Sequence, residues 1–221
     1  MSKLGYNPRL ADPDLWIKAE TRPDDGVEYY SYILCYVDDI LVLHHDSMSV
    51  LNMIDKFMKL KPDSMGDPDV YLGARLKLMQ LDNNVWCWGI SPSKYIKEAI
   101  RNCEDHLRTN FQGKYALVKS APNPFVMGYE PVMDISTVCD VDEATYLQSI
   151  IGILRWMIEI GRIDVATEVS MLSSHLAYPR VGHLEAAFHV MSYLKGQPNS
   201  RLAMDPTYPY IDETKFNTGA E

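Results

Sequence analysis

Residues 28–43 constrain the fold more than any other part of the chain. Residues 28–37 are rich in aromatic and β-branched side chains, and a second apolar run, residues 40–43, follows after only Asp38 and Asp39. Runs of this kind predict two β-strands, and a gap of two residues between them predicts a tight hairpin. We therefore expect a β-hairpin whose turn consists of Asp38 and Asp39.

The chemistry of this turn is unusual for a hairpin. Two-residue turns favour Asn-Gly, Asp-Gly or Gly because they often need positive φ. Asp38 and Asp39 also repel one another, and a divalent cation such as Mg²⁺, which prefers carboxylate oxygens, would remove that repulsion. A metal site is one interpretation, and an exposed acidic turn screened by water is the other. We interpret the nearby His44-His45-Asp46 as a strand end that runs into a helix N-cap rather than as a metal site.

Helix and strand patterns alternate after this hairpin. Ser47 predicts the N-cap of a helix. Residues 70–81 and 85–90 predict a second hairpin. Ser91 followed by Pro92 predicts the N-cap and first position of another helix, because proline is favoured at the first helical position.

The rest of the chain contains an irregular stretch and then helices. Residues 110–141 hold several prolines and little periodicity, which indicates a loop or linker. Apolar residues recur at helical spacing in residues 147–158, 163–176 and 184–194, and predict three helices. The tail from residue 199 is weakly patterned. Hairpins followed by helices predict an α+β fold.

Composition indicates a globular protein. The chain has 221 residues, of which 47% are hydrophobic, so a core is expected. No run approaches the roughly 18 apolar residues that cross a bilayer, and no signal-peptide pattern is present. Its four cysteines lack the close pairs of a zinc or redox motif. We expect a reduced, intracellular protein, cytoplasmic or nuclear, that is not secreted and has no membrane partner.

Charge is distributed unevenly along the sequence. The net charge of −9 argues against nucleic-acid binding, because phosphate contacts need Lys and Arg. Residues 71–119, however, carry 8 basic and 4 acidic side chains, whereas residues 1–70 carry 7 and 13 and residues 120–221 carry 6 and 13. The basic middle segment permits a nucleic-acid contact, with a solvated helix face as the alternative.

The string Tyr36-Val37-Asp38-Asp39-Ile40-Leu41 resembles the Tyr-X-Asp-Asp signature of reverse transcriptases, in the form of the copia-type retrotransposon branch. Further segments are similar to that family and occur in its order. They are Gly5-Tyr6 with residues 11–16, residues 71–76 (the primer grip), residues 90–96 (the thumb opening), Tyr146 with Ile150-Ile151-Gly152, Gly161-Arg162-Ile163-Asp164, and Pro179 with His183 and residues 193–196. The family's Thr-Arg-Pro-Asp has lost its Thr and Pro here, which we interpret as drift.

The resemblance implies a transposable-element RNA-directed DNA polymerase, which is a nucleotidyltransferase using Mg²⁺ or Mn²⁺. The corresponding architecture is a partial palm of antiparallel hairpins with a helix (residues 1–90), then a thumb-like helix and linker (91–141), a helical connection region (142–198) and a weakly structured tail (199–221). Its partners in the intact family are a primer–template and a deoxynucleoside triphosphate.

The resemblance also assigns site residues. Asp38 and Asp39 would be the catalytic metal ligands, with Asp38 the more direct one. Eight residues would contact nucleic acid, namely Tyr36, Tyr71, Leu72, Gly73, Ala74, Lys94, Lys97 and Arg101.

The resemblance further implies that parts of the enzyme are missing. The family's fingers and upstream palm, with a third metal-binding aspartate, should precede residue 5, and a ribonuclease H segment should follow. We therefore expect a reverse-transcriptase fragment that is catalytically incomplete by itself. The alternatives are a non-enzymatic remnant that binds nucleic acid or protein, and an inactive relic.

Overall fold

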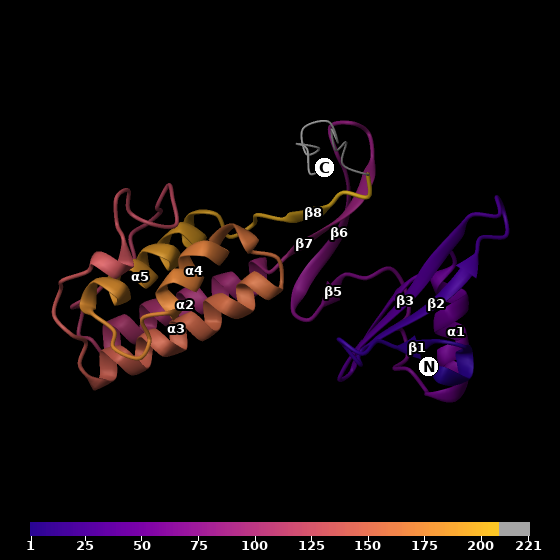
Figure 1. The fold of residues 1–221 in the computed structure, drawn as a ribbon, viewed down its shortest axis with the longest axis horizontal. Helices are drawn as coiled ribbons and strands as arrows, with labels where there is room; N and C mark the ends of the chain where they lie inside the picture. Colours follow the sequence, from indigo (N-terminus) through magenta and orange to yellow (C-terminus); the bar gives the residue numbers. More distant parts are fainter. Residues whose placement is uncertain (208–221) are drawn as a thin grey trace, which may run out of the picture. The chain divides into compact units, whose positions relative to one another are not determined.

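The protein is a mixed α+β chain (Figure 1), which confirms the predicted fold class. The structure is a computed structural model that describes residues 1–207. The described residues form two antiparallel sheets and five α-helices. They divide into two compact units, Met1–Arg75 and the residues from Leu76 onward. This division falls inside the second predicted hairpin, and part of the predicted tail, residues 208–221, lies outside the described residues.

The first unit contains a sheet in the order β1-β2-β3-β4, with strands Asn7–Pro8, Leu15–Thr21, Glu28–Tyr36 and Asp39–Leu43. Strands β3 and β4 are the predicted hairpin. Strands β1 and β2 are not predicted, because residues 1–26 are rich in turn signals and β2 carries two charged residues. These two, Lys18 and Glu20, form an ion pair with 2.6 Å between Nζ and Oε1.

Helix α1 (Ser47–Phe57) and the short 3₁₀ helix η1 (Ser2–Leu4) accompany this sheet. Val50 and Ile54 of α1 pack with Ile33 of β3 and Tyr6 in a buried cluster. The cluster is completed by Met1, Leu4, Trp16, Cys35, Ile40, Val42 and Leu60. Because side chains alternate across a strand, the core of this unit uses one face of the sheet.

The N-cap of α1 differs from the prediction by one residue. Asp46 is the N-cap, and its carboxylate accepts from the backbone N–H of Ser49 at 3.1 Å. Ser47 is the first helical residue, and its hydroxyl donates to the carbonyl of His44 at 3.0 Å. Both residue types cap helices well, and the backbone conformation decides between them.

The second sheet has the order β5-β6-β7-β8, with strands Val70–Tyr71, Ala74–Gln80, Trp86–Ser91 and Leu202–Met204. Strands β6 and β7 confirm the second predicted hairpin, but the prediction of residues 70–81 as one continuous strand is wrong. The chain turns back after Tyr71, so that β5 pairs antiparallel with β6. Strand β8 is not predicted, since three residues carry little periodic signal. It forms by pairing with a strand more than 100 residues away, as in the pair Ile90 and Leu202.

Four helices build the core of the second unit: α2 (Ser93–Thr109), α3 (Val141–Glu159), α4 (Ala166–Ser173) and α5 (Val181–Gly196), with the 3₁₀ helix η3 (Ile163–Val165) between α3 and α4. They confirm the helices predicted from periodicity. Ser91 is not the N-cap of α2, because Pro92 occupies that position. Ser91 instead ends β7, and its buried hydroxyl donates to the carbonyl of Ser200 at 2.8 Å.

The residues between α2 and α3 are irregular, as predicted, apart from the 3₁₀ helix η2 (Pro131–Met133). They are not a free linker, however. Tyr115 and Ala121 are buried, and Phe125 and Tyr129 pack against the helical core. The segment is therefore part of the second unit.

None of the helices in the described residues is long and apolar enough to cross a membrane. The four cysteines, all within the described range, are free thiols.

Candidate active site

The candidate catalytic carboxylates lie at the tip of the β3–β4 hairpin. Tyr36 pairs directly with Asp39, so the two turn residues are Val37 and Asp38. The prediction that Asp38 and Asp39 form the turn is wrong by one residue. The backbone explains the difference, because Val37 adopts the positive φ, 51°, that tight hairpin turns require.

The tip is open to solvent. Asp38 and Asp39 are both exposed, and Val37 and Tyr36 are 91% and 47% exposed. Directly paired residues of an antiparallel ladder point to the same face. Tyr36 and Asp39 therefore share one face of the sheet.

The residues at the tip fit a hard cation in kind but not in number. Carboxylate oxygens are the ligands that Mg²⁺ and Mn²⁺ prefer. Among residues 1–207, however, no group of three or more His, Cys, Asp or Glu side chains is placed to hold a metal ion. The hairpin thus supplies two adjacent ligands of the right type and no complete metal centre.

Two further acidic residues lie at the same end of the sheet. The backbone N–H of Cys35 donates to the carbonyl of Asp14 at 3.0 Å, which places residues 12–14 beside the end of β3. Burial raises the pKa of Tyr71, and the nearby charges of Asp39, Asp12 and Asp14 raise it further. Of the predicted site residues, Tyr71 and Asp39 are therefore brought together. Only the strand register reveals the position of Asp12 and Asp14.

The face of the sheet that carries Tyr36 is apolar and is not the face packed by α1. Leu41 and Leu43 of β4 pair with Leu34 and Tyr32 of β3 and share this face. Tyr30 and Leu43 remain 56% and 48% exposed. A single face thus presents Tyr30, Tyr32, Leu34, Tyr36, Leu41 and Leu43.

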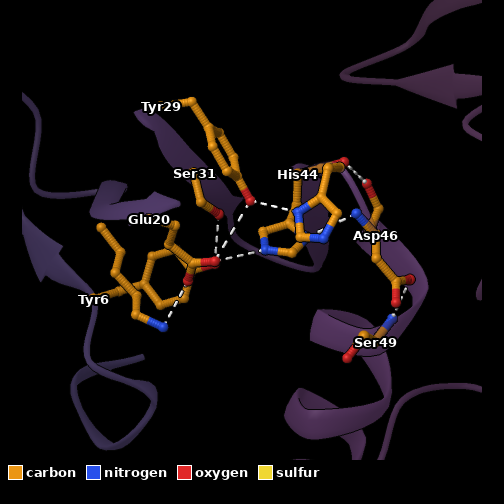
Figure 2. A network of polar contacts seen from close by, with 10 residues as sticks. Tyr6, Glu20, Tyr29, Ser31, His44, Asp46 and Ser49 are labelled. Carbon is orange, nitrogen blue, oxygen red and sulfur yellow. Dashed lines mark hydrogen bonds and ion pairs between the residues drawn. The ribbon is translucent and has the colours of Figure 1, made fainter. Parts of the chain in front are cut away.

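The opposite face of the sheet carries a polar network (Figure 2). It lies where β3 begins and β4 ends, far from the β3–β4 turn. Glu20 accepts from His44 Nε2 at 2.8 Å, and the N–H of Asp46 donates to His44 Nδ1 at 2.9 Å. The phenol of Tyr29 and the Nδ1 of His45 lie 2.6 Å apart. Both His44 nitrogens have protein partners, which agrees with the interpretation of this segment as a strand end leading into a capped helix.

The turn between β5 and β6 contains the predicted primer-grip residues. Tyr71 pairs with Ala74, which is fully buried. Leu72 and Gly73 both have positive φ, 51° and 79°. That combination defines a type I′ turn, in which Gly is favoured. The turn explains why glycine occupies position 73, and burial explains why a small side chain occupies position 74. Neither explanation requires a nucleic-acid contact.

The predicted cations of α2 lie on its solvent side. Lys94, Lys97 and Arg101 are exposed, while the intervening Ile96 and Ile100 are buried. Arg101 lies 3.7 Å from the carboxylate of Glu98, a pair that water screens. The three residues form one exposed basic stripe of the helix.

The segment Gly161-Arg162-Ile163-Asp164 has a structural role. Arg162 is 1% exposed, and its Nε and one terminal nitrogen donate to the two oxygens of Asp164 at 2.8 and 2.7 Å. Another terminal nitrogen donates to the carbonyl of Gln197 at 2.9 Å, after the end of α5. Arg162 and Asp164, which also occur in the Thr-Arg-Pro-Asp element that this segment resembles, therefore hydrogen-bond to one another. Gly161 and Ile163, which differ from that element, are not part of this pair.

Comparisons with known proteins relate the chain to proteins of transposons. No family model matches the chain. No solved structure is significantly similar to it. Curated proteins that are similar to it include three retrovirus-related Pol polyproteins from plant transposons and a putative transposon protein of yeast.

Three relatives illustrate the extent of this similarity. A putative transposon Ty5-1 protein of Saccharomyces cerevisiae is 29% identical over 232 residues, which cover 99% of this chain and 68% of that protein. The Pol polyprotein from transposon RE1 of Arabidopsis thaliana is 24% identical over 169 residues, 76% of this chain. The Pol polyprotein from transposon TNT 1-94 of Nicotiana tabacum is 22% identical over 216 residues, 96% of this chain. The chain spans only 10% and 15% of the length of these two polyproteins.

Proposed function

We propose that this chain corresponds to the part of a retrotransposon Pol polyprotein that carries the second half of a reverse-transcriptase active site. The observation that carries the proposal is the solvent-exposed hairpin tip, where Tyr36, Asp38 and Asp39 stand together at the end of a tightly paired β-hairpin. Similarity to transposon Pol polyproteins extends along the chain on both sides of this tip.

In this proposal Asp38 and Asp39 are metal ligands, and the metal would supply charge stabilisation for phosphoryl transfer. Among the described residues, no third carboxylate lies where it could hold one metal ion together with these two. Tyr36 shares the face of Asp39, which supports its proposed contact with the end of a primer. Tyr71 and the turn at Leu72 and Gly73 would hold that primer, because Tyr71 lies close to Asp39.

The sheet has room for the missing ligand. Within the part of the chain that the structure describes, strand β4 is an edge strand, paired with β3 on one side only. An unpaired edge is a template for another strand. A strand from elsewhere in the polyprotein, added beside Asp39, would place its side chains next to the carboxylates, and polymerisation would depend on that addition.

A second candidate is a nucleic-acid-binding module without catalysis. The exposed stripe of Lys94, Lys97 and Arg101 favours it, since phosphate binding needs accessible cations and no metal. The two candidates differ in the role of Asp38. Binding through α2 alone would survive its removal.

Fluorescence anisotropy with a labelled RNA–DNA primer–template tests the proposed role of α2. Replacing Lys94, Lys97 and Arg101 with alanine should weaken binding and lower the slope of log affinity against log salt by about 1 for each phosphate that the variant no longer binds. The matched control replaces Lys56, Lys59 and Lys61, which are also exposed, with alanine. Equal weakening in both triple variants would contradict a specific role for α2. Asp38→Asn should not weaken this binding, because it removes a negative charge.

A further inference from the structure

The segment from Val126 to Val141 exposes large aliphatic side chains. Met127 and Ile135 are 91% and 93% exposed, and Val132 and Met133 in η2 are 76% and 70% exposed. Three further valines are also exposed, at positions 126, 138 and 141. Exposed aliphatic surface in a confined region indicates an interaction site more often than chance exposure. We refer to residues 126–141 as the apolar loop.

The apolar loop is held in place by its inner side and its backbone. His183 Nε2 bonds the carbonyl of Pro131 at 2.9 Å, and the N–H of Val181 donates to the carbonyl of Thr137 at 2.9 Å. The N–H of Gly182 donates to the hydroxyl of Ser136 at 2.8 Å. These bonds fix the loop on the N-terminal end of α5. The aliphatic side chains are therefore displayed by an ordered segment, which lowers the entropic cost of binding.

Gly182 shows how closely the loop lies on α5. A Cβ added at this position would overlap the carboxylate of Asp134. Asp134 is itself bound, since it accepts from the phenol of Tyr129 at 2.8 Å and from the N–H of Ser136 at 2.8 Å. The inner polar groups of the loop are thus satisfied within the unit, and its outer aliphatic side chains are not covered by any of residues 1–207.

The acidic side chains around the apolar loop indicate that its partner is positively charged. Glu130, Asp140 and Asp142 are exposed, and the sequence contains no Lys or Arg between Lys119 and Arg155. Phosphate groups would be repelled here, which excludes nucleic acid as the occupant. A second copy of the same surface would place like charges face to face in a symmetric dimer.

We propose that the apolar loop is a docking surface for a basic segment of another protein, in which aliphatic residues alternate with Lys or Arg. The aliphatic side chains would pack on Val132, Met133 and Ile135, and the cations would face Glu130 and Asp142. This site shares no residue with the proposed nucleic-acid contacts or with the hairpin tip at Asp38. Its failure would leave the proposed function intact.

A labelled 16-residue peptide of alternating leucine and lysine tests the surface, with a leucine–glutamate peptide of equal length as the charge control. Fluorescence anisotropy with the full chain should show binding of the first peptide and not of the second. Val132→Ser combined with Met133→Ser and Ile135→Ser should weaken binding about tenfold or more. The matched control, Val118→Ser with Met171→Ser and Met204→Ser, removes three exposed aliphatic side chains elsewhere and should leave affinity unchanged.

A second variant keeps every aliphatic side chain. Glu130→Gln with Asp142→Asn should weaken binding of the lysine peptide and reduce its salt dependence. Equal binding of both peptides, or equal weakening in the loop and control variants, would overturn the proposal. So would sedimentation showing a dimer of the chain that the loop variant abolishes, because the occupant would then be a second copy.

Discussion

Val37 occupies a backbone conformation that β-branched residues rarely adopt. Its φ of 51° lies in the left-handed region, and its side chain is 91% exposed, so no packing compensates for the strain. This strained residue lies between Tyr36 and Asp38, inside the Tyr36-Val37-Asp38-Asp39 motif. A local conflict between residue preference and structure at a candidate site is typical of functional positions.

Replacing Val37 with glycine should raise the free energy of unfolding of the first unit by about 1 kcal/mol, because glycine adopts positive φ without strain. Urea titration followed by the amide signals of β3 measures the change. Val27, an exposed valine at the preceding turn without positive φ, is the control. Val27→Gly should destabilise by about 0.5–1 kcal/mol, and a matching destabilisation in Val37→Gly would contradict the assigned strain.

Arg162 is the second residue whose chemistry sets a clear expectation. Arg162→Met retains much of the side-chain volume but removes two of the donors to Asp164, which keeps the phenol of Tyr193, and removes the donor to the carbonyl of Gln197. The free energy of unfolding should fall by about 3 kcal/mol. Arg155, exposed on α3, is the control, and Arg155→Met should change stability by less than about 0.5 kcal/mol. Similar effects of the two substitutions, measured by urea unfolding, would show that the buried pair is unimportant.

A helix or strand could be predicted where its own residues carry a periodic pattern of apolar side chains. The hairpins β3–β4 and β6–β7 and the helices of the second unit carry their own periodicity, and all form. Strands β1, β2 and β8 could not be predicted because they are stabilised by partners along the sheet rather than by their own sequence. The turn at Val37 and the N-caps shifted by one residue, since several residue types there satisfy the same local rule.

Candidate-site residues follow the same division. Asp38 and Asp39 could be identified from adjacent carboxylates within a strong hairpin. The proximity of Asp12, Asp14 and Tyr71 could not, because it follows from strand register. Nothing in the local sequence of the hairpin reveals how many ligands lie close to it in space.

Two glycines of the helical region give opposite expectations. Gly152 in α3 has nothing within 4 Å of an added Cβ, so Gly152→Ala should stabilise the second unit by about 1 kcal/mol. Gly182→Ala would overlap Asp134 and should destabilise by about 1–3 kcal/mol. Thermal unfolding of both variants measures the difference. Stabilisation by both would mean that the apolar loop is not held against α5.

The N-terminus of α3 should give the second unit an acid-sensitive element. Burial raises the pKa of Glu143, but hydrogen bonds from Lys114, Tyr115 and the N–H of Asp140 outweigh it and hold the pKa below its usual range. A lowered folded-state pKa contributes stability above the unfolded value of 4.5 that is lost as pH falls through the folded value.

Glu143→Gln should therefore lower stability at pH 7 and flatten the dependence of stability on pH below about 4.5. Urea unfolding at several values between about pH 3 and pH 7 measures both effects. Asp142→Asn, at an exposed neighbouring position, is the control and should retain the wild-type slope. An unchanged acid slope in Glu143→Gln would contradict the role of this carboxylate.

At the scale of the whole molecule, the surface is divided by chemistry. The first unit presents an apolar, tyrosine-rich sheet face beside the carboxylates of the hairpin tip. The second unit presents the basic stripe on α2 and the apolar loop, residues 126–141, with its exposed acidic side chains. Exposed aromatic rings suit base stacking, whereas the acidic loop repels phosphate. These properties agree with the proposals of a nucleic-acid contact, a separate protein contact and an active site completed by another segment.

Primer extension on an RNA template with Mg²⁺ or Mn²⁺, comparing the chain with Asp38→Asn, tests whether the chain alone holds only part of a polymerase site. Circular dichroism of the same samples establishes that both are folded. We expect primer–template binding by both proteins and no extension by either, because no group of three or more His, Cys, Asp or Glu side chains among residues 1–207 is placed to hold a metal ion. Extension by the chain that Asp38→Asn abolishes would contradict this expectation, since the chain would then assemble a complete polymerase site by itself.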